Sequence, residues 1–469
     1  MWIPSQCEQV KAILVAQHNM EEISILEDEV FRQRMAELDV AQIWVCPSFN
    51  HGFDFTDGAW ETLDGLLAIG HSAAASWPYY LAAYKPERTL ACISVSGQWP
   101  YHRDKWLCPD IWGERNINKI PCLETMGEYE SAHTWSNEGL KERKEHPLLP
   151  LSMLACPAEG HFAYTPEKAQ YIALYIKKAM HYGHVDPTKE GWLMERWKKN
   201  EKPSCIPAPV NQFKGDPAQA FWFFDREMIE ATLAYQSRYY DMKPQLVSVS
   251  QNGKTVSQQN THLQVHPAFM PQEDGITFQL TPVFWDTVPG ESPRLSNWTD
   301  LPVGASVGHA GKTPVLQMIT GPAVLVDSVT FRIQWNRGTL WTDKKSDIVF
   351  SITHPGDEEY KPAVQQAQVT IPVKNTEGQQ QHIKFATLPD IKRGTKYVSL
   401  SAVSSCGLPV DFYVESGPAY VDGNRLILTA IPPKTTYPVK VTVIAWQYGK
   451  NSDPKIKTAE PVKQTFYIR

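Results

Sequence analysis

The stretch that decides the fold reads Leu66-Leu-Ala-Ile-Gly-His-Ser-Ala-Ala-Ala-Ser76. Four apolar residues lead into Gly70, His71 and Ser72, and small residues that suit the start of a helix follow. A nucleophilic serine on a tight turn between a strand and a helix needs small residues two positions before it and two after it, because larger side chains would clash with the strained backbone. Gly70 and Ala74 meet that need, so the pattern predicts a sharp turn at Ser72. The alternative is an ordinary strand-to-helix junction, since the pattern is Gly-x-Ser-x-Ala rather than Gly-x-Ser-x-Gly.

Short apolar runs alternate with helical patterns on both sides of this stretch. The runs are continuous, as expected for parallel strands that are covered on both faces. This alternation predicts an α/β fold. The apolar runs comprise residues 12–16, 43–46, 66–69, 90–95, 120–123 and 151–155, and the helical patterns cover residues 25–38, 74–84 and 166–180.

The segment from residue 2 to residue 185 resembles the α/β-hydrolase superfamily of serine esterases, lipases and peptidases. The resemblance rests on the turn at Ser72, on the helical pattern after it and on the apolar run at 90–95. It implies an α/β-hydrolase-type, mostly parallel sheet flanked by helices. It also implies a nucleophile, an acid and a histidine, in that order along the chain.

Residues 120–130 resemble the strand of this family that ends in Gly-x-x-Asp/Glu, which implies Glu130 as the acid. Glu128 is the close alternative, and Asp104 and Asp110 are further rivals. The acid would hold the imidazole in the correct tautomer and stabilise its protonated form.

Residues 157–162, Pro-Ala-Glu-Gly-His-Phe, resemble the Gly-His loop that precedes the last helix of the family. This implies His161 as the base, because a serine hydroxyl is a weak nucleophile until an imidazole takes its proton. A solvent-exposed loop histidine is the alternative interpretation.

The resemblance further implies an oxyanion hole, a pair of backbone N–H groups that holds the negative oxygen of the tetrahedral intermediate. One donor is expected at Ala73. The other is expected in the turn after the run at 12–16, where Asn19 and Met20 are the candidates. His71, beside the nucleophile, is interpreted as a packing residue rather than a second base.

The chain changes character after this first domain, which is predicted over residues 1–185. Residues 186–244 are rich in Trp, Lys and Pro and become amphipathic at 221–240, which predicts a helical connector packed on the first domain. From residue 245 onward, apolar runs of period two and frequent turn residues predict all-β sandwich domains over 245–388 and 389–469. Residues 405–447 resemble bacterial immunoglobulin-like modules, which occur in cell-surface and exported proteins.

The composition excludes several classes of partner. The chain has 469 residues, with 45 Lys and Arg against 51 Asp and Glu. It therefore has no basic surplus for nucleic acid, and no apolar run approaches the ~20 residues of a membrane-spanning helix. No metal, nucleotide or redox cofactor is expected, because the motifs that hold them do not occur. Four cysteines fall in predicted strands and are expected to be buried thiols: Cys46, Cys92, Cys122 and Cys156.

These features predict a serine ester hydrolase that works through an acyl-enzyme on a small-molecule or carbohydrate ester. The choice of an acylated or methylated polysaccharide rests on the appended β modules and on the family resemblance. A serine peptidase or amidase on the same scaffold is one alternative, and a non-catalytic carbohydrate-binding or surface-interaction protein is another. The resemblance of residues 405–447 to immunoglobulin-like modules implies a periplasmic, cell-surface or extracellular bacterial protein, although the start of the chain lacks the pattern of an export signal. The oligomeric state stays open.

Overall fold

The computed structural model describes residues 1–45, 65–97, 99, 113, 116–130, 132–258, 264–290, 295–431 and 435–469. The chain divides into two compact units, each built from three separate segments. The first unit comprises Met1–Val247, Phe284–Lys312 and Thr353–Gln366, and the second comprises Ser248–Val283, Thr313–Ile352 and Ala367–Arg469. The domain boundaries expected from the sequence stay a prediction.

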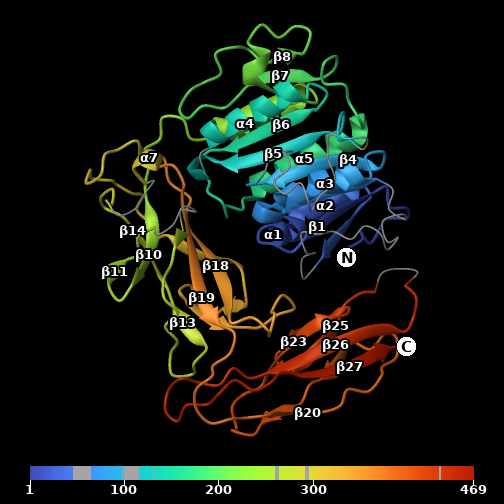
Figure 1. Cartoon of the computed structure of the whole chain (residues 1–469), viewed down its shortest axis with the longest axis vertical. Coiled ribbons are helices and arrows are strands. Elements are labelled where there is room, and N and C mark those ends of the chain that lie inside the picture. The colour runs from blue at the N-terminus through green and yellow to red at the C-terminus, as the bar shows by residue number, and fades with distance from the viewer. Residues whose placement is uncertain are drawn as a thin grey trace. The chain divides into compact units, whose positions relative to one another are not determined.

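The first unit contains a six-stranded sheet in the order β2-β1-β3-β4-β5-β6, in which every neighbouring pair is parallel (Figure 1). At the β2 edge, Trp2 forms an antiparallel bridge with Gln42. The expected fold class, a parallel α/β sheet followed by a β-rich region, is confirmed. The strands are β1 (Ala12–Gln17), β2 (Val40–Val45), β3 (Leu66–His71), β4 (Thr89–Val95), β5 (Cys122–Gly127) and β6 (Leu151–Cys156).

The continuous apolar runs become strands because they are covered on both faces. All six residues of β3, of β5 and of β6 are buried. The helical pattern at 25–38 forms two helices, because Asp28 leaves the helical conformation and its side chain accepts the N–H of Phe31 to start the second one. The helices around the sheet are α1 (Glu22–Glu27), α2 (Glu29–Glu37), α3 (Trp77–Tyr84), α4 (Ala132–Glu145) and α5 (Pro166–Tyr182).

The segment 186–244 differs from the expected helical connector. It contains a three-stranded antiparallel sheet, β8-β7-β9, and one helix. The aromatic run at 221–223 lies in a fully buried strand rather than in the predicted helix, because four consecutive apolar residues suit a covered strand. The elements are β7 (Trp192–Glu195), β8 (Ala208–Pro209), β9 (Ala220–Phe223) and α6 (Arg226–Gln236).

The rest of the described chain is β-rich, as the period-two pattern predicts, and includes the short helix α7 (Leu295–Thr299). Its sheets have the orders β11-β10-β14, β12-β19-β18-β15, β13-β17-β16, β20-β22, β21-β25-β24 and β23-β26-β27. The strands are β10 (Val247–Gln251), β11 (Lys254–Thr255), β12 (Gln264–Val265), β13 (Thr277–Gln279), β14 (Thr281–Phe284), β15 (Val315–Thr320), β16 (Ala323–Leu325), β17 (Thr330–Ile333), β18 (Lys345–His354), β19 (Ala363–Pro372), β20 (Ile383–Phe385), β21 (Tyr397–Ser399), β22 (Ala402–Ser404), β23 (Asp411–Ser416), β24 (Ala419–Asp422), β25 (Arg425–Leu428), β26 (Val439–Trp446) and β27 (Val462–Ile468).

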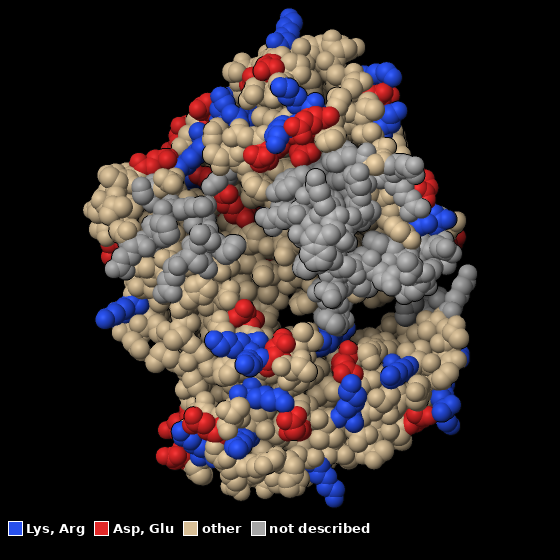
Figure 2. Space-filling model, in the orientation of Figure 1, with Lys and Arg blue, Asp and Glu red and all other residues tan. Residues whose placement is uncertain are grey.

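The distribution of surface charge and the burial of the cysteine thiols agree with the expectations from the composition. Basic and acidic side chains are interspersed on the face drawn in Figure 2. Among the described residues, no helix is long and apolar enough to cross a membrane. Cys92, Cys122 and Cys156 are buried free thiols, which confirms their prediction, whereas Cys46 lies outside the described residues.

Candidate active site

Three polar side chains meet beyond the carboxyl ends of β3, β5 and β6. Ser72 is the first residue after β3, and Glu130 ends a short 3₁₀ turn after β5. His161 lies in the loop between β6 and α5. The carboxyl ends of parallel strands meet at one edge of the sheet. The topology therefore gathers residues that are far apart in the sequence.

The three side chains form a continuous chain of hydrogen bonds. Ser72 Oγ lies 2.7 Å from His161 Nε2, and His161 Nδ1 contacts Glu130 Oε1. The other carboxylate oxygen of Glu130 accepts the N–H of Gly127 at 3.2 Å. In this arrangement the imidazole donates from Nδ1 and accepts the serine proton at Nε2. The structure thus brings together Ser72, His161 and Glu130.

The turn at Ser72 is strained and tightly packed. Ser72 has φ of 55°, in the left-handed region that residues with side chains rarely adopt. A Cβ atom at Gly70 would collide with the main-chain carbonyl group of Ala74. Ala74 is itself buried, at 4% exposure. The small residues on both sides of Ser72 are therefore required by the backbone, as the sequence pattern indicates.

The electrostatics of the site favour a basic imidazole. Burial alone lowers the pKa of His161, but the charge of Glu130 and its hydrogen bond raise that pKa by more, so it lies above its ordinary value. Burial alone raises the pKa of Glu130, yet the charge and hydrogen bond of His161 and the N–H of Gly127 leave that pKa below its ordinary value. The pair therefore stabilises the protonated imidazole that forms when Ser72 gives up its proton.

The alternative acid, Glu128, has other partners. Its Oε2 accepts the N–H of Ala158 at 2.8 Å, and its Oε1 lies 2.7 Å from Lys361 Nζ. Glu128 thus holds the loop that leads to His161, whereas Glu130, two residues later on the same turn, contacts the imidazole. The rivals Asp104 and Asp110 lie outside the described residues.

The three candidate oxyanion donors have different surroundings in the structure. Ala73 is exposed at the start of the 3₁₀ helix Ser72–Ser76, where its N–H belongs to the first turn. The side-chain amide of Asn19 donates to the carbonyl oxygen of His71 at 2.6 Å, which brings the turn after β1 beside Ser72. The N–H of Met20 donates to Glu22 Oε2 at 2.9 Å. The main-chain N–H groups of Asn19 and Met20 both lower the pKa of Glu22 through hydrogen bonds, so the choice between these two residues as the donor stays a prediction.

A buried ionic cluster also holds the loop between β6 and α5, which carries His161. Glu159 pairs with Lys168 of α5, with 2.9 Å between Oε2 and Nζ. The other oxygen of Glu159 accepts hydrogen bonds from the side chains of Tyr235 and Arg238 near the end of α6. Two helices thus fix the loop two residues before His161.

Two acidic residues beside the site were not singled out by the sequence analysis. Glu21 is 0% exposed and Glu22 is 1% exposed. Burial raises the pKa of Glu21 to about 8 and that of Glu22 to about 7. Two adjacent glutamates after the expected oxyanion turn were a visible signal, but ordinary glutamates are solvated, and only the tertiary structure shows their burial.

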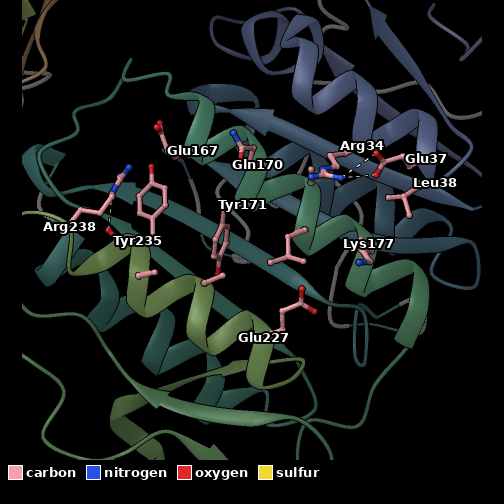
Figure 3. A pocket seen from close by; sticks show the side chains of 14 residues that line it. Arg34, Glu37, Leu38, Glu167, Gln170, Tyr171, Lys177, Glu227, Tyr235 and Arg238 are labelled. Atoms are coloured by element: carbon pink, nitrogen blue, oxygen red, sulfur yellow. Dashed lines mark hydrogen bonds and ion pairs between the residues drawn. The ribbon is translucent and has the colours of Figure 1, made fainter.

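A groove of about 660 Å³ lies elsewhere on the first unit, over α2, α5 and α6. Figure 3 shows Arg34 and Glu37 paired at one end and Tyr235 with Arg238 at the other. Ser72, His161 and Glu130 do not line it. This groove is therefore separate from the candidate active site.

No protein-family model matches the chain, and no curated protein matches it in sequence. The solved structures that it resembles include an S-formylglutathione hydrolase from Agrobacterium tumefaciens, at 12% identity and a TM-score of 0.29 over 38% of this chain and 87% of that one. Est1E from Butyrivibrio proteoclasticus, with bound ferulic acid, has 15% identity and a TM-score of 0.24 over 38% and 92%. Human protocadherin-24 EC1-2 has 12% identity and a TM-score of 0.16 over 48% and 97%. These scores describe partial overlaps, so the roles of residues rest on the geometry of the site.

Proposed function

We propose that this chain is a serine hydrolase that cleaves carboxylic esters through an acyl-enzyme. The observation that carries the proposal is the hydrogen-bonded series from Ser72 Oγ through His161 to Glu130, with 2.7 Å between Ser72 Oγ and His161 Nε2. The positive φ of Ser72 supports it, because a strained turn is the usual setting of a nucleophile that projects from a sheet.

The proposed reaction has two halves. Ser72 Oγ bonds to the carbonyl carbon while its proton passes to His161 Nε2, and the N–H groups of Ala73 and Asn19 stabilise the oxyanion. The tetrahedral intermediate collapses when His161 gives that proton to the leaving alcohol, which leaves the acyl group on Ser72. Water then attacks the acyl carbon with His161 as the base, and the acid and free Ser72 are released. Glu130 stabilises the protonated imidazole in both halves.

For the substrate class we propose an acyl or methyl ester carried on an oligosaccharide or polysaccharide. The support is the likeness of residues 405–447 to modules of exported bacterial proteins, which would place the enzyme outside the cytoplasm. A comparison of acetylated and methyl-esterified polysaccharides with simple chromogenic esters tests this choice. Equal kcat/KM values for the polysaccharide esters and the chromogenic esters would contradict the proposed substrate class.

A fluorophosphonate probe tests the nucleophile. We expect the probe to label the wild-type chain covalently and Ser72→Ala not at all, with kcat for a chromogenic ester reduced at least ~10,000-fold in the variant. Labelling that survives the substitution would remove Ser72 from the mechanism. Faster cleavage of peptide anilides than of esters would instead favour the peptidase or amidase alternative, and no labelling of a folded wild-type chain would favour the non-catalytic one.

A further inference from the structure

The carboxyl group of Glu22 joins two separate loops at the candidate active site. Its Oε2 accepts the N–H of Met20 at 2.9 Å, in the turn after β1. Its Oε1 accepts the N–H of His71 at 2.7 Å, in the residue directly before Ser72. Glu22 and His71 are both at least 99% buried, at 1% and 0% exposure, so water does not compete for these bonds.

A second bond joins the same two loops. Asn19 Nδ2 donates to the carbonyl oxygen of His71 at 2.6 Å. Both main-chain groups of His71 are therefore held by the segment that follows β1, the N–H by Glu22 at the start of α1 and the carbonyl by Asn19 in the turn before it.

The side chain of His71 extends this connection to the third loop of the site. Its Nε2 lies 2.8 Å from the carbonyl oxygen of His161, and its ring centroid lies 4.8 Å from that of His161. Burial lowers the pKa of His71 well below its ordinary value, so the ring is neutral and carries one proton. A carbonyl oxygen only accepts, so that proton is on Nε2.

We propose that Glu22 is a positioning residue, whose carboxyl group fixes the turn after β1 against the turn of Ser72 and so sets the spacing of the oxyanion donors Asn19 and Ala73. This proposal rests on the proposed serine hydrolase function. An oxyanion hole works only when its donors are already placed where negative charge develops. Because that charge exists in the transition state and not in the bound substrate, poorer placement lowers kcat and leaves KM nearly unchanged.

Glu21 provides a matched control. It adjoins Glu22 in the sequence and is equally buried, and its nearest ion-pair contact is His71 Nε2 at 3.7 Å. Within the described part of the chain, neither oxygen of Glu21 has a hydrogen-bond partner. Glu21→Gln therefore changes a buried carboxyl group at this place without removing a bond between the two loops.

The experiment compares wild type with Glu22→Ala, Glu22→Gln and Glu21→Gln, all as full-length chains with a cooperative thermal transition. The measurements are kcat and KM for a chromogenic ester and the inhibition constant of phenylboronic acid, which forms a tetrahedral adduct with an active serine. We expect kcat of Glu22→Ala to fall about 10- to 100-fold, somewhat less than the loss of an oxyanion donor itself. Boronic acid affinity should fall in parallel, while KM stays within about threefold.

Glu22→Gln keeps the shape and one acceptor oxygen, so its kcat should lie between those of wild type and Glu22→Ala. Glu21→Gln should keep kcat within about threefold on the alkaline plateau of the pH profile, where His161 is neutral whether or not Glu21 contributes to its pKa. If Glu22→Ala does not fold, Glu22→Gln and Asn19→Ala carry the test, because Asn19→Ala removes the side-chain bond to His71 and retains the backbone N–H.

Two results would overturn the positioning role: folded Glu22 variants with wild-type kcat and boronic acid affinity, or a Glu21→Gln variant as impaired as Glu22→Gln. Fluorophosphonate labelling separates this failure from that of the proposed function. If the folded wild-type chain is not labelled, the hydrolase function fails and the role of Glu22 fails with it. If it is labelled and the Glu22 variants react normally, only the role of Glu22 fails.

Discussion

His161 contacts both other side chains of the candidate site, and its protonation state determines whether Ser72 can be activated. A neutral imidazole accepts the serine proton, whereas a protonated one cannot. Burial favours the neutral form, and Glu130 favours the protonated form by more, which leaves the pKa of His161 above its ordinary value. Glu21 acts in the same direction as Glu130, and Lys168 acts against it. The acid side of the pH profile therefore reports on the contact between His161 and Glu130.

We expect kcat/KM of the wild-type chain to fall with decreasing pH through an apparent pKa above the ordinary histidine value of about 6.5. Glu130→Gln removes the charge that raises this pKa, so its acid limb should move to lower pH, with kcat reduced roughly 100- to 10,000-fold. The measurement is kcat/KM between about pH 5 and 9. Glu128→Gln is the control, since Glu128 contacts Ala158 and Lys361 instead, and its limb should not move. If the acid side of the kcat/KM profile does not move in Glu130→Gln, the result would contradict the pairing of His161 with Glu130.

The junction of β3 with the helix after it is the element on which the site depends. Gly70 lies against the backbone of Ala74, and Gly97 lies equally close to Ala75. This close packing allows the chain to reverse within a few residues and present Ser72 at the edge of the sheet. The requirement for small residues is therefore a property of the whole junction, and the sequence displays it directly.

Gly70→Ala should lower the free energy of unfolding by about 1–3 kcal/mol, because the added methyl group meets main-chain atoms that cannot move aside. Urea denaturation measures the change. Gly311→Ala is the matched control, since among the described residues no atom outside its chain neighbours lies within 4 Å of its added Cβ, and its effect should stay within about 0.5 kcal/mol. Equal urea midpoints for the two variants would show that the junction can accommodate a methyl group at Gly70.

On the scale of the molecule, the first unit includes segments far along the chain. Trp298 stacks on Tyr129 at 4.6 Å between ring centroids, and its Nε1 donates to the carbonyl oxygen of Tyr129. Lys361 pairs with Glu128, and both side chains are 6% exposed. Residues beyond position 280 thus hold the turn that carries Glu130.

Lys361→Ala should destabilise the protein by about 3 kcal/mol, because the N–H of Ala158 and the more distant Lys199, 3.8 Å from the same oxygen as Lys361, compensate the buried charge of Glu128 only in part. Lys374→Ala is the control, since Lys374 pairs with Glu460, whose side chain is 82% exposed, and such pairs contribute little. Chemical denaturation of both full-length variants gives the comparison. Similar losses would mean that the ion pair of Lys361 behaves as a solvated one.

The α/β class and the junction at Ser72 follow from the sequence, because continuous apolar runs and small-residue turns are local patterns. The order of Ser72, Glu130 and His161 was implied by the family resemblance. The resemblance also implied Glu130 before Glu128, and the tertiary structure distinguishes their contacts, since the two carboxyl groups on one short turn face different partners. Only the tertiary structure showed that Met20 donates to a buried Glu22, that residues 221–223 form a strand, and that distant segments complete the first unit. These features depend on contacts between residues remote in the sequence, and neither periodicity nor spacing records such contacts.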